Sequence, residues 1–170
     1  MKLSPLQMVH SQFEGISLIA VEMEMPDLDT NGAPYPEIKG EHINTEVILG
    51  TPPDESEPTR FSIKLSIDNL KVRPDDFPYM FAAKIEGIFN IDHDGDFTER
   101  KRMVVINGTA MLYGLIREQF LMLSSRHKHG PMQLPSLDFR VLQENKPDDQ
   151  EPTPPVTVQT KKPARKKKPA

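Results

Sequence analysis

The sequence contains no cysteine and no tryptophan among its 170 residues, and its apolar runs are short. Without cysteine, a disulfide framework, a thiolate zinc site and a cysteine nucleophile are excluded, and a reducing compartment is a natural setting. No apolar stretch approaches the roughly 20 residues that a membrane-spanning helix needs. The N-terminus has a single base, Lys2, and Glu14 interrupts the apolar residues after it, so no signal peptide is visible. We therefore expect a cytoplasmic protein without membrane insertion.

Charge is distributed unevenly along the chain. The 21 Lys and Arg residues and the 25 Asp and Glu residues give a formal net charge of -4, but six of the bases and no acid lie within the last ten residues. Without those six, residues 1–160 hold 15 bases against 25 acids, a net of -10. Residues 145–170 are also too poor in apolar side chains to offset the entropy of ordering. We predict an acidic domain over residues 12–144, an N-terminal extension over residues 1–11 and a disordered Pro- and Lys-rich tail over residues 145–170.

The first half of the chain shows the period-two pattern of strands. Alternation is clearest over residues 61–67, a longer alternating run covers residues 79–91, and two weaker segments end near Leu49 and near Met25. The apolar parity shifts at Asn69, which we interpret as a bulge. Residues 92–96, Asp-His-Asp-Gly-Asp, do not have the spacing of a calcium loop, and we interpret them as a hairpin turn that closes the fourth strand.

The apolar period then changes to that of a helix. Spacings of one, three and four run from Thr109 to His127, with Asn107-Gly108 in the position of an N-cap. Gly130-Pro131 ends the helical region, and residues 134–142 are expected to form a docked extended piece or a short helix. The predicted fold is α+β, with one long helix on one face of a four-stranded sheet and a short closing element.

One helix covers only one face of a sheet, yet the first and fourth strands carry apolar residues on both parities. We interpret the second set as an apolar face that packs against another subunit. The alternative is that these residues merely border loops. The set comprises Ile19, Val21, Met23, Met80, Ala82 and Ile88.

Several short stretches, taken in order, resemble the SecB-type protein-export chaperones. Residues 12–13 and 23–26 resemble the family's first strand, and residues 86–91 resemble the end of its fourth. A helix with an Arg-Glu pair and a terminal Ser-Arg follows, then a Pro- and Leu-containing loop that leads to Phe139. The matching positions there are Arg117, Glu118, Arg126, Pro131, Leu134 and Pro135. The resemblance spans about residues 12–142 with the order of elements intact.

This resemblance implies a SecB-like fold with a four-stranded antiparallel sheet, assembled as a homotetramer, a dimer of dimers. It implies ATP-independent holding of unfolded polypeptides in apolar grooves, with no cofactor. The nine methionines suit this activity because their side chains adapt to varied surfaces. The family's groove is built from the second strand and the closing element, whereas Ile116 and Phe120 on the helix are better interpreted as core. The implied client-binding residues are Ile43, Val47, Leu49, Leu137, Phe139 and Leu142.

Departures from the family concern its export partner, the SecA motor. In the family, acids on strands one and four contact the motor; Glu24 matches one of them, while Ala20 and Ala82 stand at others. The family's polar tail is replaced by a Lys run, and the helix after Phe139 has room for about two turns at most. Chaperone activity is therefore better supported than the export partnership. Some members of the family instead serve a single antitoxin, and this alternative stays open.

Other classes of function find little support in the sequence. It has no nucleophile elbow and no Gly-rich phosphate loop, so we do not expect an enzyme. His127 and His129 lack a third ligand, and we interpret them as a cationic helix end rather than a metal site. The Lys-rich tail suits nonspecific binding of nucleic acid through phosphates, although it lacks aromatic residues for stacking; a solubilising tail is an equal alternative.

Overall fold

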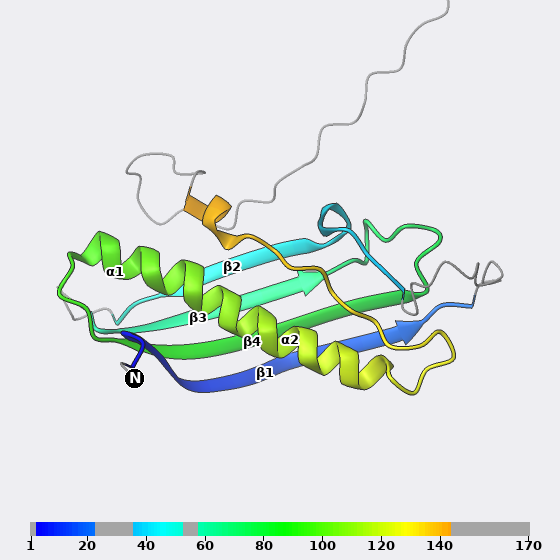
Figure 1. The fold of residues 1–170 in the computed structure, drawn as a ribbon, viewed down its shortest axis with the longest axis horizontal. Helices are drawn as coiled ribbons and strands as arrows, with labels where there is room; N and C mark the ends of the chain where they lie inside the picture. The colour runs from blue at the N-terminus through cyan, green and yellow to red at the C-terminus, as the bar shows by residue number, and fades with distance from the viewer. Residues whose placement is uncertain (1–2, 23–35, 53–57, 144–170) are drawn as a thin grey trace, which may run out of the picture.

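The computed structural model describes residues 3–22, 36–52 and 58–143. A four-stranded antiparallel sheet in the order β1-β4-β3-β2 forms one layer, and a long helix crosses one of its faces diagonally (Figure 1). The strands are β1 (Leu6–Ala20), β2 (Asn44–Gly50), β3 (Arg60–Asp68) and β4 (Tyr79–Ile91). The helical elements are η1 (Gly40–His42), α1 (Phe97–Met103), η2 (Val104–Gly108), α2 (Thr109–Ser124) and η3 (Phe139–Gln143). The predicted α+β fold, with one long helix on an antiparallel sheet, is confirmed.

The core lies between the sheet and the helix. The alternating apolar residues of the third and fourth strands are buried, as predicted, and β4 has the predicted bounds. Leu112, Ile116 and Phe120 of α2 are fully buried against them, and the ring centroids of Phe120 and Phe81 are 5.1 Å apart. Ile116 and Phe120 are therefore core residues, as preferred from the sequence. None of the described helices is long and apolar enough to cross a membrane.

Strand β1 differs from its prediction at both ends. It begins at Leu6, so residues 6–11, which we assigned to an N-terminal extension, pair with β4 in the sheet. Its last residue is Ala20, and the predicted end near Met25 lies outside the described residues. The 15 residues of β1 run along the 13 of β4 because the register shifts twice, between Met8 and His10 and between Phe13 and Gly15. These irregularities, each with one extra residue, disrupt the apolar period that marks a regular strand.

The bulge predicted at Asn69 is wrong, because β3 ends at Asp68 and a turn follows. The buried Asn69 side chain bonds to the backbone of β4: its Nδ2 donates to the Tyr79 carbonyl at 2.9 Å, and its Oδ1 accepts from the Phe81 amide at 2.8 Å. The Leu70 amide donates to the Asp68 carboxylate at 3.0 Å. The shift in apolar parity thus marks the end of β3, where the Asn69 side chain makes hydrogen bonds to the backbone of β4.

The helix begins at Phe97 rather than near Thr109, so residues 92–96 join β4 to α1 and are not a hairpin turn. Asp96 is the N-cap, and its carboxylate accepts a hydrogen bond from the Glu99 amide at 2.8 Å. The Asp-x-x-Glu spacing resembles that of a capping box. This start was missed because α1 has only Phe97 and Met103 as apolar residues, which is too few for a visible helical period.

Gly108, which we predicted at an N-cap, lies inside the continuous helix in the π-helical turn η2. A Cβ atom at Gly108 would stand 2.6 Å from Cδ1 of Ile63 and 3.3 Å from the Phe89 ring. The absence of a side chain therefore lets the helix approach the sheet closely at this point. The π-turn itself is a short irregularity of the kind that occurs within longer helices.

Candidate functional site

The closing segment, residues 131–143, returns from the helix end and lies on the β2 side of the helix (Figure 1). Three side chains of α2 hold its backbone: the Ser124 hydroxyl accepts from the Met132 amide at 2.6 Å, Arg117 Nε donates to the Leu134 carbonyl at 3.0 Å, and the Tyr113 hydroxyl donates to the Pro135 carbonyl at 2.7 Å. Burial raises the pKa of Tyr113 to about 12, against a smaller opposing effect of the Arg117 charge. The segment is thus fixed to the helix at Met132, Leu134 and Pro135.

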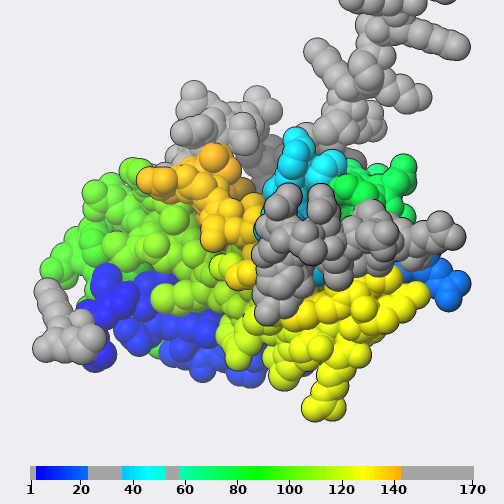
Figure 2. All heavy atoms as spheres, turned by 45° about the vertical axis from the view of Figure 1, so that its right-hand side comes forward, coloured from blue at the N-terminus to red at the C-terminus, as the bar shows by residue number. Residues whose placement is uncertain are grey.

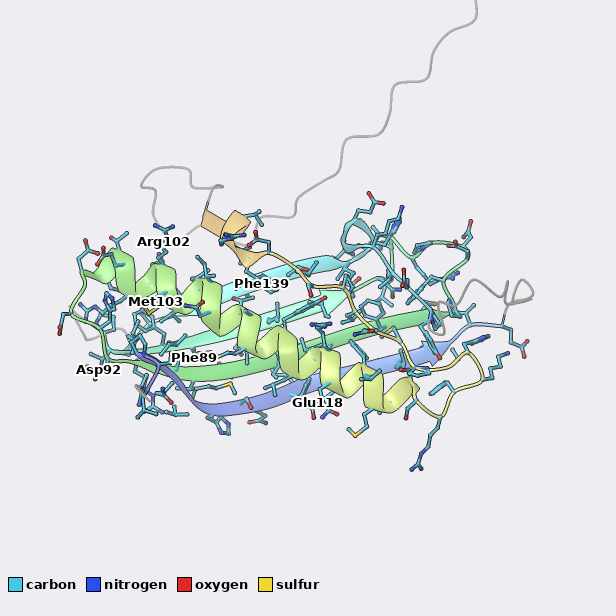
Figure 3. The ribbon with its side chains drawn as sticks, viewed as in Figure 1. Phe89, Asp92, Arg102, Met103, Glu118 and Phe139 are labelled. Atoms are coloured by element: carbon cyan, nitrogen blue, oxygen red, sulfur yellow. The ribbon has the colours of Figure 1, made fainter. Side chains whose placement is uncertain are left out.

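The family-like positions have three kinds of surroundings. Arg117, Leu134 and Pro135 come together in the contacts between the helix and the closing segment. Glu118 and Arg126 are exposed, and Figure 3 shows Glu118 on the other flank of the helix from Phe139. Pro131 follows Gly130, whose φ of 78° suits glycine at the turn after the helix. The resemblance to the family thus includes residues that fix the closing segment.

His127 and His129 pack against one aromatic ring. Each histidine ring lies edge-on to Tyr79, with ring centroids 5.9 Å apart, and the Tyr79 hydroxyl donates to the Gly130 carbonyl. His129 is buried, and its Nε2 lies 3.1 Å from the Val21 carbonyl. No group of three metal-ligating side chains occurs in the described parts of the chain. The geometry gives both histidines a packing role.

The predicted client-binding residues lie along β2 and the closing segment, but they differ in exposure. Ile43 and Phe139 are buried, and Phe139 packs edge-on against Tyr113 with centroids 5.5 Å apart. Val47, Leu49 and Leu137 are half-buried against the same core, while Leu142 is exposed. Its neighbour Val141, which we did not predict, is exposed as well. We name the accessible set the closing strip: Val47, Leu49, Leu137, Val141 and Leu142.

A second apolar surface, on the other flank of the helix, was missed. The helix leaves part of the β1 face uncovered, and Figure 2 shows β1 in blue beside the green and yellow atoms of the helix. Met111, Leu115 and Met122 share one side of α2 because they are spaced by four and seven residues, a signal that the sequence already contained. Met122 is 59% exposed. We name this surface the β1–α2 strip: Met8, Phe13, Ile16, Met111, Leu115 and Met122.

The opposite face of the sheet, which we predicted to be apolar and to pack against another subunit, carries charged side chains at its centre. Lys64 and Lys84 lie at its centre, where the Glu14 carboxylate accepts from Lys64 at 2.7 Å and pairs with Lys84 at 3.0 Å. These hydrogen bonds, from Lys64 first and Lys84 second, lower the pKa of Glu14. The charged centre separates Ile19 and Met80 at one end of the face from Ile88 at the other. Glu24, the predicted motor contact, lies outside the described residues.

Comparison with known proteins adds structural similarities at low identity. No family model matches the chain, and no curated protein matches it. Among solved structures, the chain is similar to a SecB-like chaperone of Mycobacterium tuberculosis in complex with a ChAD peptide from the HigA1 antitoxin. The two share 15% sequence identity, the match covers 79% of this chain and 91% of that chain, and the TM-score is 0.42. The chain is also similar to a protein of unknown function from Streptococcus agalactiae, with 16% identity, coverage of 78% and 97%, and a TM-score of 0.48.

Proposed function

We propose that this protein is a chaperone that holds unfolded polypeptide segments on apolar side chains of its surface, without ATP. The observation that carries the proposal is that the closing strip and the β1–α2 strip hold exposed and half-buried apolar side chains on the two flanks of the helix. Apolar side chains exposed in this number are typical of a surface that binds other chains. The ordered resemblance of residues 12–142 to SecB-type chaperones supports the same class of function.

We assign the two strips different roles. The closing strip binds clients, because it contains the accessible part of the residues that correspond to the family's groove. The β1–α2 strip joins copies of the chain, because its apolar residues come from a strand edge and a helix flank that together form one surface. A dimer of dimers is the assembly that the resemblance implies.

A pair of matched variants tests this assignment. V141S/L142S removes exposed apolar side chains from the closing strip, and M111S/M122S removes exposed ones from the β1–α2 strip. Each buried aliphatic side chain contributes about 1.5–3 kcal/mol, so each pair should weaken its own contact by at least about tenfold. The first variant should keep the native mass and lose suppression of client aggregation, and the second should lose mass.

The assay uses a reduced, unfolded model protein at one chaperone assembly per client, without nucleotide. The unaltered chain should suppress light scattering and should form a complex visible by native mass measurement. A monomer that leaves the client aggregating would contradict the proposal. Equal loss of suppression in both variants, with unchanged mass, would contradict the separate roles of the strips.

A second candidate is a chaperone dedicated to one partner, such as an antitoxin, which the resemblance to the family leaves open. Isolation of bound proteins from cells separates the two: many unfolded clients favour a general chaperone, and one partner favours a dedicated chaperone. Contact with SecA through Glu24 and nonspecific binding of nucleic acid through the Lys-rich tail remain predictions, since both fall outside the described residues.

A further inference from the structure

The two edges of the sheet differ in how well they are protected against pairing with another chain. β1 and β2 are both edge strands, because the order is β1-β4-β3-β2. β1 is interrupted by two register shifts, and the charged Glu14 lies within the second of them. Such irregularities and charges are the usual means by which proteins prevent an edge from recruiting another strand.

β2 is less protected than β1, because its pairing with β3 has no register shift. Its seven residues, Asn-Thr-Glu-Val-Ile-Leu-Gly, pair with β3 in a continuous register from Asn44 to Gly50 and include no proline, no lysine and one charged residue, Glu46. Within residues 3–22, 36–52 and 58–143, no segment pairs with the far side of β2. About half of its backbone N–H and C=O groups therefore point away from β3, where an added strand would find them.

The side chains of β2 define what such a strand would be. Val47 and Leu49 face the helix side and continue into the closing strip, while Ile48 points to the other face and is 51% exposed. An incoming strand would thus have apolar neighbours on both of its faces. The net charge of -10 over residues 1–160 disfavours an acidic partner.

We propose that β2 binds its client by strand addition: an extended, non-acidic segment of about seven residues, with β-branched or aromatic side chains, adds to the free edge of β2. The backbone supplies affinity that depends little on sequence, and the apolar residues of the closing strip supply the preference for unfolded chains. This inference rests on the proposed chaperone function and specifies how the closing strip acts.

The test uses a soluble peptide of about seven residues built from Val, Ile, Thr and Lys, with the full-length protein. Two further versions of the peptide carry N-methyl groups on alternate backbone amides, one at the odd and the other at the even positions. Because alternate N–H groups of an extended strand point to opposite sides, each version loses the hydrogen-bond donors on one side of the peptide and keeps every side chain. Strand addition predicts that one version binds about tenfold or more weakly and that the other binds like the unmodified peptide. Equal binding of both versions would overturn the proposal.

A pair of protein variants provides an independent arm. I48S removes the exposed apolar side chain of the β2 edge, opposite Lys64, without adding a charge, and should weaken peptide binding several-fold. I19S is the matched control, since Ile19 lies on the same face at the other edge with 55% exposure, and it should leave peptide binding unchanged. If I48S instead splits the free protein into smaller units, the edge joins copies of this chain and the inference is wrong. Suppression of aggregation that persists while both methylated peptides bind equally would refute strand addition and leave the chaperone function standing.

Discussion

Replacement of Asn69 by alanine tests how the sheet is held at the end of β3. The Asn69 side chain is fully buried, and its two hydrogen bonds satisfy the Tyr79 carbonyl and the Phe81 amide. Alanine leaves both backbone groups without that partner, in a site that water does not reach. A lost buried hydrogen bond with an orphaned partner costs about 1–3 kcal/mol, and the backbone bond from the Asn69 amide to the Phe81 carbonyl remains. We expect N69A to lower the free energy of unfolding by roughly 2–4 kcal/mol.

Urea titration followed by circular dichroism measures this loss, and the thermal midpoint should fall by roughly 5–15 °C for a chain of this size. N44A is the matched control. The Asn44 side chain also makes a hydrogen bond at an end of β3, from Nδ2 to the Asp68 carboxylate at 3.1 Å, but it is exposed. It should change stability by less than about 0.5 kcal/mol. Similar losses in the two variants would refute the role of burial in this reasoning.

Four further predictions concern the helix and the closing segment. D96A removes the N-cap of α1 and should cost about 1 kcal/mol, measured by urea titration, with a smaller loss in D96N. G108A forces the helix away from the sheet and should cost about 1–3 kcal/mol, with a changed near-ultraviolet spectrum. Y113F removes the hydrogen bond to the closing segment and should cost about 1 kcal/mol of stability. In the unaltered chain the pKa of Tyr113 is raised to about 12, so the stabilisation by its hydroxyl is complete below pH 10 and is lost as pH rises through about 12. Ultraviolet titration of the tyrosine follows this loss. Hydrogen bonds from Arg140 lower the pKa of Asp138 from 3.8 to about 2, so the pair should persist until pH falls through about 2, and R140A should return the titration midpoint seen by NMR toward 3.8.

The strands of the core were predictable because each has one buried and one more exposed face. In β3 and β4, strict alternation identified both the elements and their buried residues. In β1, the register shifts at Met8 and Phe13 change the parity, so the sequence shows only its second half as a regular strand. The start of α1 was hidden for a different reason, since it has little apolar surface and depends on the Asp96 cap.

The candidate site was less predictable than the fold because exposure depends on tertiary packing. The sequence identified Phe139 and Leu142 together, yet the ring of Tyr113 covers one of them and leaves the other exposed. The contact of Arg117 with the Leu134 carbonyl joins residues whose order resembles the family, but nothing in their spacing specifies the bond. The methionines of α2, by contrast, were visible as a stripe and were not recognised.

The order of the strands in the sheet has a consequence for how the chain folds. β2, β3 and β4 pair with their neighbours in the sequence, and such local pairing costs less loop-closure entropy than pairing over a longer separation. β1 is synthesised first, but its partner is β4, so it stays unpaired until most of the sheet has been made. A chain emerging from the ribosome therefore carries an exposed apolar strand of its own, and the longest ladder of the sheet forms only after β4 has emerged.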